Sequence, residues 1–456
     1  MSKLPLLSRL GLDRPELRAW ATYDWAASAV QTTIMVAVFP IYFVKVAGAE
    51  LPASSATQRL ATVNTLALVV IALISPMLGA ISDYKGTKKR LLAVFMFIGV
   101  AAIGGMFFIR RGEIDLASAL FLVSMIGVAG SFVFYEALLP HIARPEEIDR
   151  VSSAGYAVGY VGGGLLLALN LAWILKPAWF GLPSGPDLSE AQATLPIRLA
   201  FVSVAVWWVV FSLPLFRRVP EPPPRLEPDE HPGESPVRMA FVRMAETFRE
   251  LRGYRQAFLM LVAFLIYNDG IQTIIRMATA YGTELGIGQN SLIAAILLVQ
   301  FIGFPCTLLF GTLAGRIGAK RAIFLGLVAY TVISVLGYFM KNATHFYVLA
   351  GFVGVVQGGT QALSRSLFAS MIPPHKSGEF FGFFSVFEKF AGIFGPLIFA
   401  GTIAATGSSR NAMLSVIAFF VIGAVILAFV DIEEGRRAAA KAEAAAVPLA
   451  RSSAVS

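Results

Sequence analysis

The chain has 456 residues, of which 57% are hydrophobic and only 14% are charged, whereas soluble globular domains carry roughly a quarter of charged residues. This composition excludes an ordinary soluble protein and predicts an all-α membrane protein, because a bilayer core about 30 Å thick needs about 20 apolar residues for each spanning helix. The single cysteine, Cys306, cannot form an intrachain disulfide and has no nearby ligand set, so we expect no metal and no cofactor.

Twelve apolar segments of spanning length follow one another along the chain. The first six cover residues 22–45, 60–82, 91–109, 116–140, 152–175 and 197–216. The last six cover residues 257–281, 291–314, 322–340, 346–371, 380–405 and 412–430. We expect no cleavable signal peptide, because the first segment follows a polar, basic stretch and lacks a small-residue cleavage site.

A charged segment at 217–255 separates the two sets of six helices. It holds seven prolines, which predicts a linker, with a surface helix at 237–251. We expect an N-terminal six-helix bundle over 1–216, a C-terminal bundle over 256–432, and a tail over 433–456 that begins as a frayed helix and is disordered.

The basic residues are distributed unevenly between the two sides of the predicted membrane. With twelve spans, both termini share one side with the linker, and that side carries 26 of the 37 Lys and Arg residues. Cytoplasmic loops of membrane proteins carry such an excess. We therefore expect a multi-pass integral membrane protein with both termini in the cytoplasm, in the inner membrane if the source is bacterial. The net charge of +9 is attributed to orientation and membrane lipid rather than to nucleic acid.

A short motif after the second helix recurs after the eighth. The sequence GAISDYKGTKKR begins at Gly79 and GTLAGRIGAKR begins at Gly311, an offset of 232 residues. Recurrence on the same side of the membrane predicts two parallel repeats of six helices. Asp83 can accept hydrogen bonds from the N-terminus of a neighbouring helix, and with Lys88 and Arg90 it is predicted to form a conformational latch. The alternative is a solvated loop charge.

This motif resembles the loop 2–3 signature of the major facilitator superfamily, although Gly315 stands where the second copy would have its acid. Five further motifs resemble those of the "unknown major facilitator" family, which includes the autophagy-related vacuolar effluxers of fungi: YDWAAS (23–28), FYEALLP (134–140), GYVGGG (159–164), YNDGIQT (267–273) and QGGTQALSRS (357–366). The resemblance implies a twelve-helix facilitator fold and, through the fungal members, export of amino acids. Ala27, Glu136 and Glu388 depart from the family pattern.

Polar residues recur at helical spacing inside the seventh helix. Asp269, Gln272, Thr273 and Arg276 fall at i, i+3, i+4 and i+7, which places them on one face of an apolar helix. A charge at the bilayer centre costs about 3 kcal/mol on insertion scales, so such residues face protein or water and usually serve function. The stripe therefore predicts part of a cavity wall.

Two charges are the first candidates for a substrate or ion site. Asp269 lies about 20 Å into its helix, near the membrane centre, and is a candidate for binding a proton or a substrate ammonium. Arg365, which follows Gln361 in the tenth helix, is a candidate anchor for a carboxylate or phosphate, because a guanidinium offers a bidentate fork. For both charges the alternative is an ion pair that only joins helices. Asp24 and Gln31 mark a similar stripe in the first helix, where Asp24 is equally a candidate helix anchor.

Three charges lie elsewhere in the predicted helices. Glu136, near the cytoplasmic end of the fourth helix, is a candidate gate, a proton relay or a solvated carboxylate. Glu388 and Lys389 are adjacent and diverge by about 100° on a helix, so they need separate partners, and Lys389 is a candidate second anion anchor. The facilitator architecture implies that helices 1, 4, 7 and 10 line a central cavity.

These features favour a secondary transporter over other classes. A channel or a structural protein would not need charges of both signs in several helices of each half. The sequence has no Walker motif and no His-x-x-x-His pair, so we expect neither ATP hydrolysis nor an enzyme. We predict a monomer that moves a small polar solute, such as an amino acid or a related zwitterion or anion, by alternating access, with protons as the candidate coupling ion. The alternative is a lipid or lysophospholipid translocator on the same fold.

Overall fold

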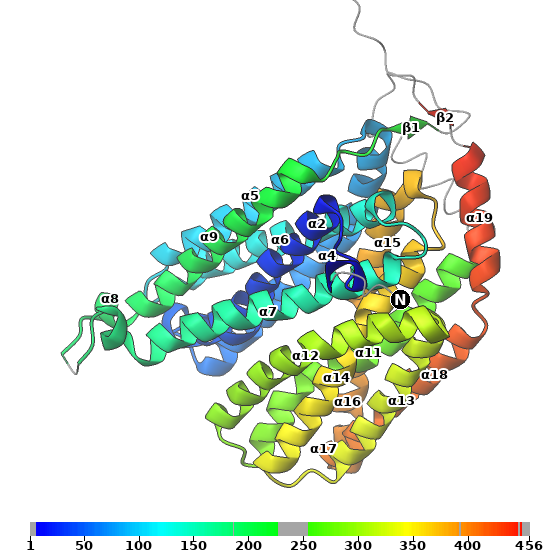
Figure 1. Ribbon diagram of the computed structural model, residues 1–456. Coiled ribbons are helices and arrows are strands. Elements are labelled where there is room, and N and C mark those ends of the chain that lie inside the picture. Colours follow the sequence, from blue (N-terminus) through cyan, green and yellow to red (C-terminus); the bar gives the residue numbers. More distant parts are fainter. Residues whose placement is uncertain (1–5, 186, 227–253, 392–393, 446, 449–456) are drawn as a thin grey trace, which may run out of the picture.

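The computed structural model describes residues 6–185, 187–226, 254–391, 394–445 and 447–448. Long helices make up this part of the chain, in two bundles that lie side by side (Figure 1). Eleven runs of helix among the described residues are long and apolar enough to cross a membrane. The predicted surface helix at 237–251 lies outside the described residues.

The first bundle contains the first six spans. The first span, Pro15–Ala47, joins α2 (Pro15–Ala29), the π-helix η1 (Val30–Ala37), α3 (Phe39–Tyr42) and the π-helix η2 (Phe43–Ala47). The other five are α4 (Ala53–Lys85), α5 (Lys88–Gly105), α6 (Ile114–Ile142), α7 (Ile148–Leu175) and α9 (Leu195–Arg218). Short elements lie outside these spans: α1 (Leu6–Arg9), η3 (Met106–Phe108), η4 (Pro177–Phe180) and α8 (Glu190–Ala193).

The second bundle follows the linker. Its first four spans are α11 (Arg255–Glu284), α12 (Gln289–Ile317), α13 (Ala319–Tyr338) and α14 (Ala343–Ala369). The turn η6 (Pro374–Lys376) leads into α15 (Ser377–Phe390) and α16 (Phe394–Thr406). The last span, Ser409–Ala428, joins α17 (Ser409–Ser415) to α18 (Ile417–Ala428).

The eleventh predicted helix is broken, so the prediction of one continuous helix over 380–405 is wrong. α15 has 14 residues and α16 has 13, and each alone is shorter than the about 20 residues that span a bilayer. Ala391, after the end of α15, has an extended backbone. Pro396 falls in the first turn of α16, where proline is tolerated, whereas inside a continuous helix it would remove a hydrogen bond.

The tail begins with a helix, as the sequence predicts. α19 (Ile432–Ala445) covers the stretch expected to be a frayed helix, and the expected disorder beyond it falls on residues 449–456, which lie outside the described residues. The alanines of α19 favour a helix, and Glu443 anchors it to η6 by accepting from the backbone N–H of His375 at 3.0 Å. Next to it, β1 (Arg225–Leu226) pairs antiparallel with β2 (Val447–Pro448).

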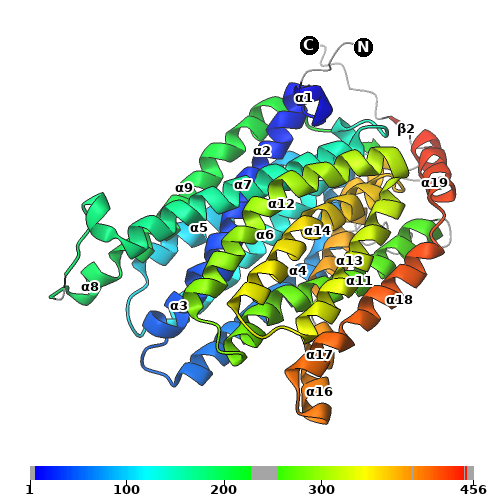
Figure 2. The ribbon, with the colours of Figure 1, turned by 60° about the horizontal axis from the view of Figure 1, so that its bottom comes forward.

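Figure 2 shows the two ends of the molecule. We call the end with α1, α19 and β2 the α19 end, and the opposite end, with α16 and α17, the α17 end. Between the bundles, α4 packs against α15, and α7 packs against α12 and α14. The glycines of α7 pack against α2: a Cβ at Gly159 would meet Ser28, and one at Gly162 would meet Trp25.

Candidate functional site

A cavity of about 610 Å³ lies between the two bundles. Small-molecule sites commonly have volumes of about 300–1,000 Å³. The first bundle contributes wall residues from α2, η1, α6 and α7, and the second contributes them from α11 to α15 and α17. The prediction that helices 1, 4, 7 and 10 line a central cavity is therefore confirmed, and helices 5 and 8 contribute as well.

Several polar residues of the predicted stripes and motifs lie on the cavity wall, together with Glu388. These are Asp24, Ser28 and Gln31 from the first span, Gln272 and Arg276 from α11, Gln357 and Gln361 from α14, Glu136 from α6 and Glu388 from α15. Gln31 belongs to η1, and π-helical turns are frequent at functional sites. The wall reaches the α17 end at Tyr281, Phe346 and Met413.

Asp269 does not line the cavity, so its prediction as a cavity residue is wrong. The side chain is buried, and its carboxylate oxygens accept from the backbone N–H of Gly395, at 3.1 Å for Oδ1 and 3.0 Å for Oδ2. Gly395 lies in the first turn of α16, so the carboxylate caps that helix. A Cβ on Gly395 would overlap the side chain of Thr273, which explains the glycine.

The polar stripe of α11 therefore faces two neighbours. Asp269 and Thr273 face α16, whereas Gln272 and Arg276 face the cavity. A polar stripe about 100° wide is broad enough to reach two adjacent surfaces. Arg276 remains within electrostatic range of Asp269.

Arg365 is fully buried between the bundles rather than exposed on the wall. Its Nε donates to Ser152 Oγ and its Nη2 to the Ser152 carbonyl, both at 3.0 Å. Its Nη1 lies 3.6 Å from Asp24 Oδ2 and 3.9 Å from Glu136 Oε1. The prediction that Asp269 and Arg365 face one another across a cavity is wrong. Instead, Arg365 joins α14 to three helices of the other bundle.

Asp83 makes the kind of contact that its motif predicts. Its Oδ1 accepts from the backbone N–H of Gly378 at 3.1 Å and its Oδ2 from that of Glu379 at 2.9 Å, so this α4 side chain caps α15 of the other bundle. Lys88 is buried and pairs with Asp83. The side chain of Arg90 is exposed to solvent. That these contacts act as a conformational latch stays a prediction.

Two further residues concern the cavity: one that the sequence analysis did not predict, and one predicted residue whose side chain the structure does not describe. Gln300 of α12 lines the cavity and was not predicted, because the residues three and four positions before and after it are apolar or glycine. As the single polar residue of the run LLVQFIG, it did carry a usable signal. The predicted anion anchor Lys389 has a side chain that lies outside the described part of the structure.

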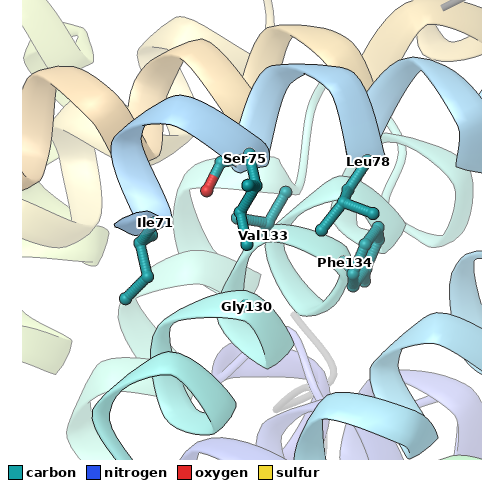
Figure 3. A pocket seen from close by; sticks show the side chains of 7 residues that line it. Ile71, Ser75, Leu78, Gly130, Val133 and Phe134 are labelled. Carbon is teal, nitrogen blue, oxygen red and sulfur yellow. The ribbon is translucent and has the colours of Figure 1, made fainter. Parts of the chain in front are cut away.

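A crevice between α4 and α6 is shown in Figure 3. Its walls are mainly apolar, and it has no room for a water molecule. Ser75 and Leu78 from α4 and Val133 and Phe134 from α6 point into it. We interpret this crevice as a packing gap, which leaves the central cavity as the candidate site.

Comparison with known proteins supports a transport site. The family described as "Vacuole effluxer Atg22 like" matches residues 44–440. A Bacillus subtilis protein named "Uncharacterized MFS-type transporter YxiO" is 37% identical over 423 residues, which cover 91% of this chain and 94% of that protein. "Autophagy-related protein 22" of Yarrowia lipolytica is 25% identical over 499 residues, which cover 91% of this chain and 81% of that protein.

Solved structures with similar folds are also transporters. The proton:xylose symporter XylE superposes with a TM-score of 0.67 at 13% identity, covering 92% of this chain and 96% of that one. The major facilitator transporter FucP, in its outward conformation, superposes with a TM-score of 0.62 at 12% identity, covering 92% and 100%. At these identities the likeness concerns the fold.

Proposed function

This chain belongs to the Atg22-like family of major facilitator transporters, and from that premise we propose that it moves a small zwitterionic solute, such as an amino acid, by alternating access. It is a membrane transporter and not an enzyme. The observation that carries the proposal is that the cavity wall holds charges of both signs. Arg276 is suited to a solute carboxylate, and Glu388, Asp24 and Glu136 are suited to an ammonium group.

The contacts between the bundles support an outward-facing state. At the α19 end, Asp83 caps α15, Arg365 bonds to Ser152, and His141 Nε2 lies 3.0 Å from Ser377 Oγ. The cavity extends from these contacts to the α17 end. The excess of basic residues at the α19 end supports placing that end, with both termini, in the cytoplasm. Rocking of the bundles would then expose the same cavity to the other side.

Proton coupling is assigned to Glu136 rather than to Asp269. Glu136 reaches both the cavity and the Arg365 guanidinium, whereas Asp269 is held by α16. A carboxylate placed between solute and cation can change its protonation as either partner leaves. Charged and amide side chains on the wall favour a polar solute over the lipid alternative, which would need apolar walls.

Transport by purified protein in liposomes tests the proposal. The solutes are amino acids and the corresponding amines without a carboxylate, each with and without an imposed pH gradient. The proteins compared are wild type, Arg276→Gln and the control Arg111→Gln, whose arginine is exposed. A hydrogen bond to a charged group contributes about 1.5–3 kcal/mol, so Arg276→Gln should raise KM for amino acids about 10- to 100-fold. It should leave any amine transport and the control variant unchanged. An unaltered KM for every carboxylate-bearing solute would refute the assignment.

A further inference from the structure

The guanidinium of Arg365 sits among three aromatic rings of the other bundle. Its Cζ lies 4.3 Å from the ring centre of Tyr156, 5.0 Å from that of Trp20 and 5.8 Å from that of Tyr135. Trp20 and Tyr135 stack on one another at 4.5 Å. A set of rings around a cation is the arrangement by which proteins bind ammonium ligands. We call these three rings the aromatic cage.

Arg365 shares this place with two carboxylates. Those of Asp24 and Glu136 are buried and lie beside the guanidinium. Its Nη1 is buried and makes no hydrogen bond, because the nearest carboxylate oxygens are 3.6 and 3.9 Å away. The Tyr135 hydroxyl donates to Asp24 at 3.2 Å and fixes that carboxylate in place. Arg365 therefore occupies a preformed cation site that fits it incompletely.

One ring of the aromatic cage, that of Tyr156, lines the transport cavity, whereas Trp20 and Tyr135 are fully buried. Asp24, Glu136 and Tyr156 line the cavity and also contact or approach Arg365. The rings and both carboxylates belong to α2, α6 and α7 of the first bundle, whereas Arg365 belongs to α14 of the second. Any movement that separates the bundles at the α19 end withdraws the guanidinium and leaves two carboxylates among aromatic rings.

We propose that the aromatic cage, with Asp24 and Glu136, binds the cationic group of the transported solute, and that Arg365 occupies this site as an internal substitute while the α19 end is closed. The inference rests on the proposed transport function and narrows its solute to compounds with an ammonium or guanidinium group. A solute cation and Arg365 then exclude one another. Opening of the α19 end is favoured when a solute cation takes the site that Arg365 leaves, because the carboxylates stay neutralised.

Calorimetric titration of the purified protein tests the site without relying on transport. The probes are guanidinium chloride and tetramethylammonium chloride, each at constant ionic strength against sodium chloride. Arg365→Ala should bind at least one probe at least 10-fold more tightly than wild type. Arg111→Ala, which removes an exposed arginine outside the cavity, should show no gain. Adding Trp20→Leu to Arg365→Ala should abolish the gain.

A second variant covers the case in which Arg365→Ala does not fold. Arg365→Gln keeps a side-chain amide that can donate to Ser152, so it should fold and show the same gain in affinity. The inference is overturned if folded variants bind the probes no more tightly than wild type, or if the gain survives Trp20→Leu. This experiment measures probe binding by variants of Arg365, so it can fail while wild-type transport and its dependence on Arg276 hold. Conversely, transport can fail while the Arg365 variants bind the probes more tightly.

Discussion

The cap that Asp269 places on α16 can be tested by two substitutions, of which only one keeps a hydrogen-bond acceptor. Asp269→Asn keeps an acceptor oxygen for the Gly395 N–H but loses the charge, whereas Asp269→Ala loses both. A hydrogen bond from a buried N–H to a charged acceptor contributes about 1.5–3 kcal/mol, and removal of a helix cap costs about 0.5–2 kcal/mol. Asp269→Ala should therefore destabilise the protein by about 1–3 kcal/mol.

The asparagine variant should lose less. Asparagine is as good a capping residue as aspartate, and the interaction of the charge with the helix dipole contributes only about 0.3–1 kcal/mol at exposed sites and up to about 2 kcal/mol in partly buried ones. The unfolding temperature in detergent should be highest for wild type, lower for the asparagine variant and lowest for the alanine variant. Transport in liposomes by Asp269→Asn should stay within a few-fold of wild type.

The outcome that refutes this reasoning is specific. If Asp269→Asn unfolds at the temperature of wild type but has lost solute uptake or its dependence on a pH gradient, Asp269 carries a proton or contacts the solute. The capping geometry would then be incidental to its role. Gly395→Ala provides a second control, because its Cβ would overlap Thr273 and separate α16 from α11 while Asp269 stays intact.

Two further predictions concern the α19 end. A Cβ on Gly79 would overlap the backbone of Gly378, so Gly79→Ala should separate α4 from α15. In a variant without Cys306, spin labels at the exposed positions 85 and 321 should then lie farther apart. A distance distribution equal to that measured without the substitution would contradict this. Burial raises the pKa of Glu221, whose carboxylate accepts from the Lys89 N–H at 3.0 and 3.1 Å. With a raised pKa, the folded protein binds the proton more readily than the unfolded chain does. The stability of wild type relative to Glu221→Gln should therefore rise as the pH falls from neutral through that pKa. Melting temperatures of the two proteins that change in parallel across this range would argue against it.

Local patterns in the sequence were sufficient for the positions of most of the spanning helices. The fifth segment, predicted at 152–175, is α7 at Ile148–Leu175, because hydropathy depends only on the residues themselves. The polar stripe of the first helix was also correct, since Asp24 and Gln31 both line the cavity. The break before α16 was missed, although the adjacent Gly395 and Pro396 are residues that commonly interrupt helices.

The errors at Asp269 and Arg365 have one physical cause. Helical periodicity tells which residues share a face, but it does not tell which neighbour that face meets. Asp269 meets the N-terminus of α16, which exists only because the eleventh segment is broken. Arg365 meets side chains more than 200 residues away in the chain, such as Ser152. Both contacts depend on how the helices pack, which a single sequence does not reveal.

The two halves of the broken helix are capped by carboxylates that should behave differently. Asp83 caps α15 from the other bundle, and Asp269 caps α16 from within the same bundle. Bundles that move as rigid bodies keep the second contact in every conformation and lose the first when the α19 end opens. We therefore predict that the free energy of the Asp83 contact shifts the equilibrium between conformations, where each 1.4 kcal/mol changes the populations about tenfold. The free energy of the Asp269 contact enters only the stability of the fold. We therefore expect the cap at the start of α15 to influence conformation and the cap at the start of α16 to support structure.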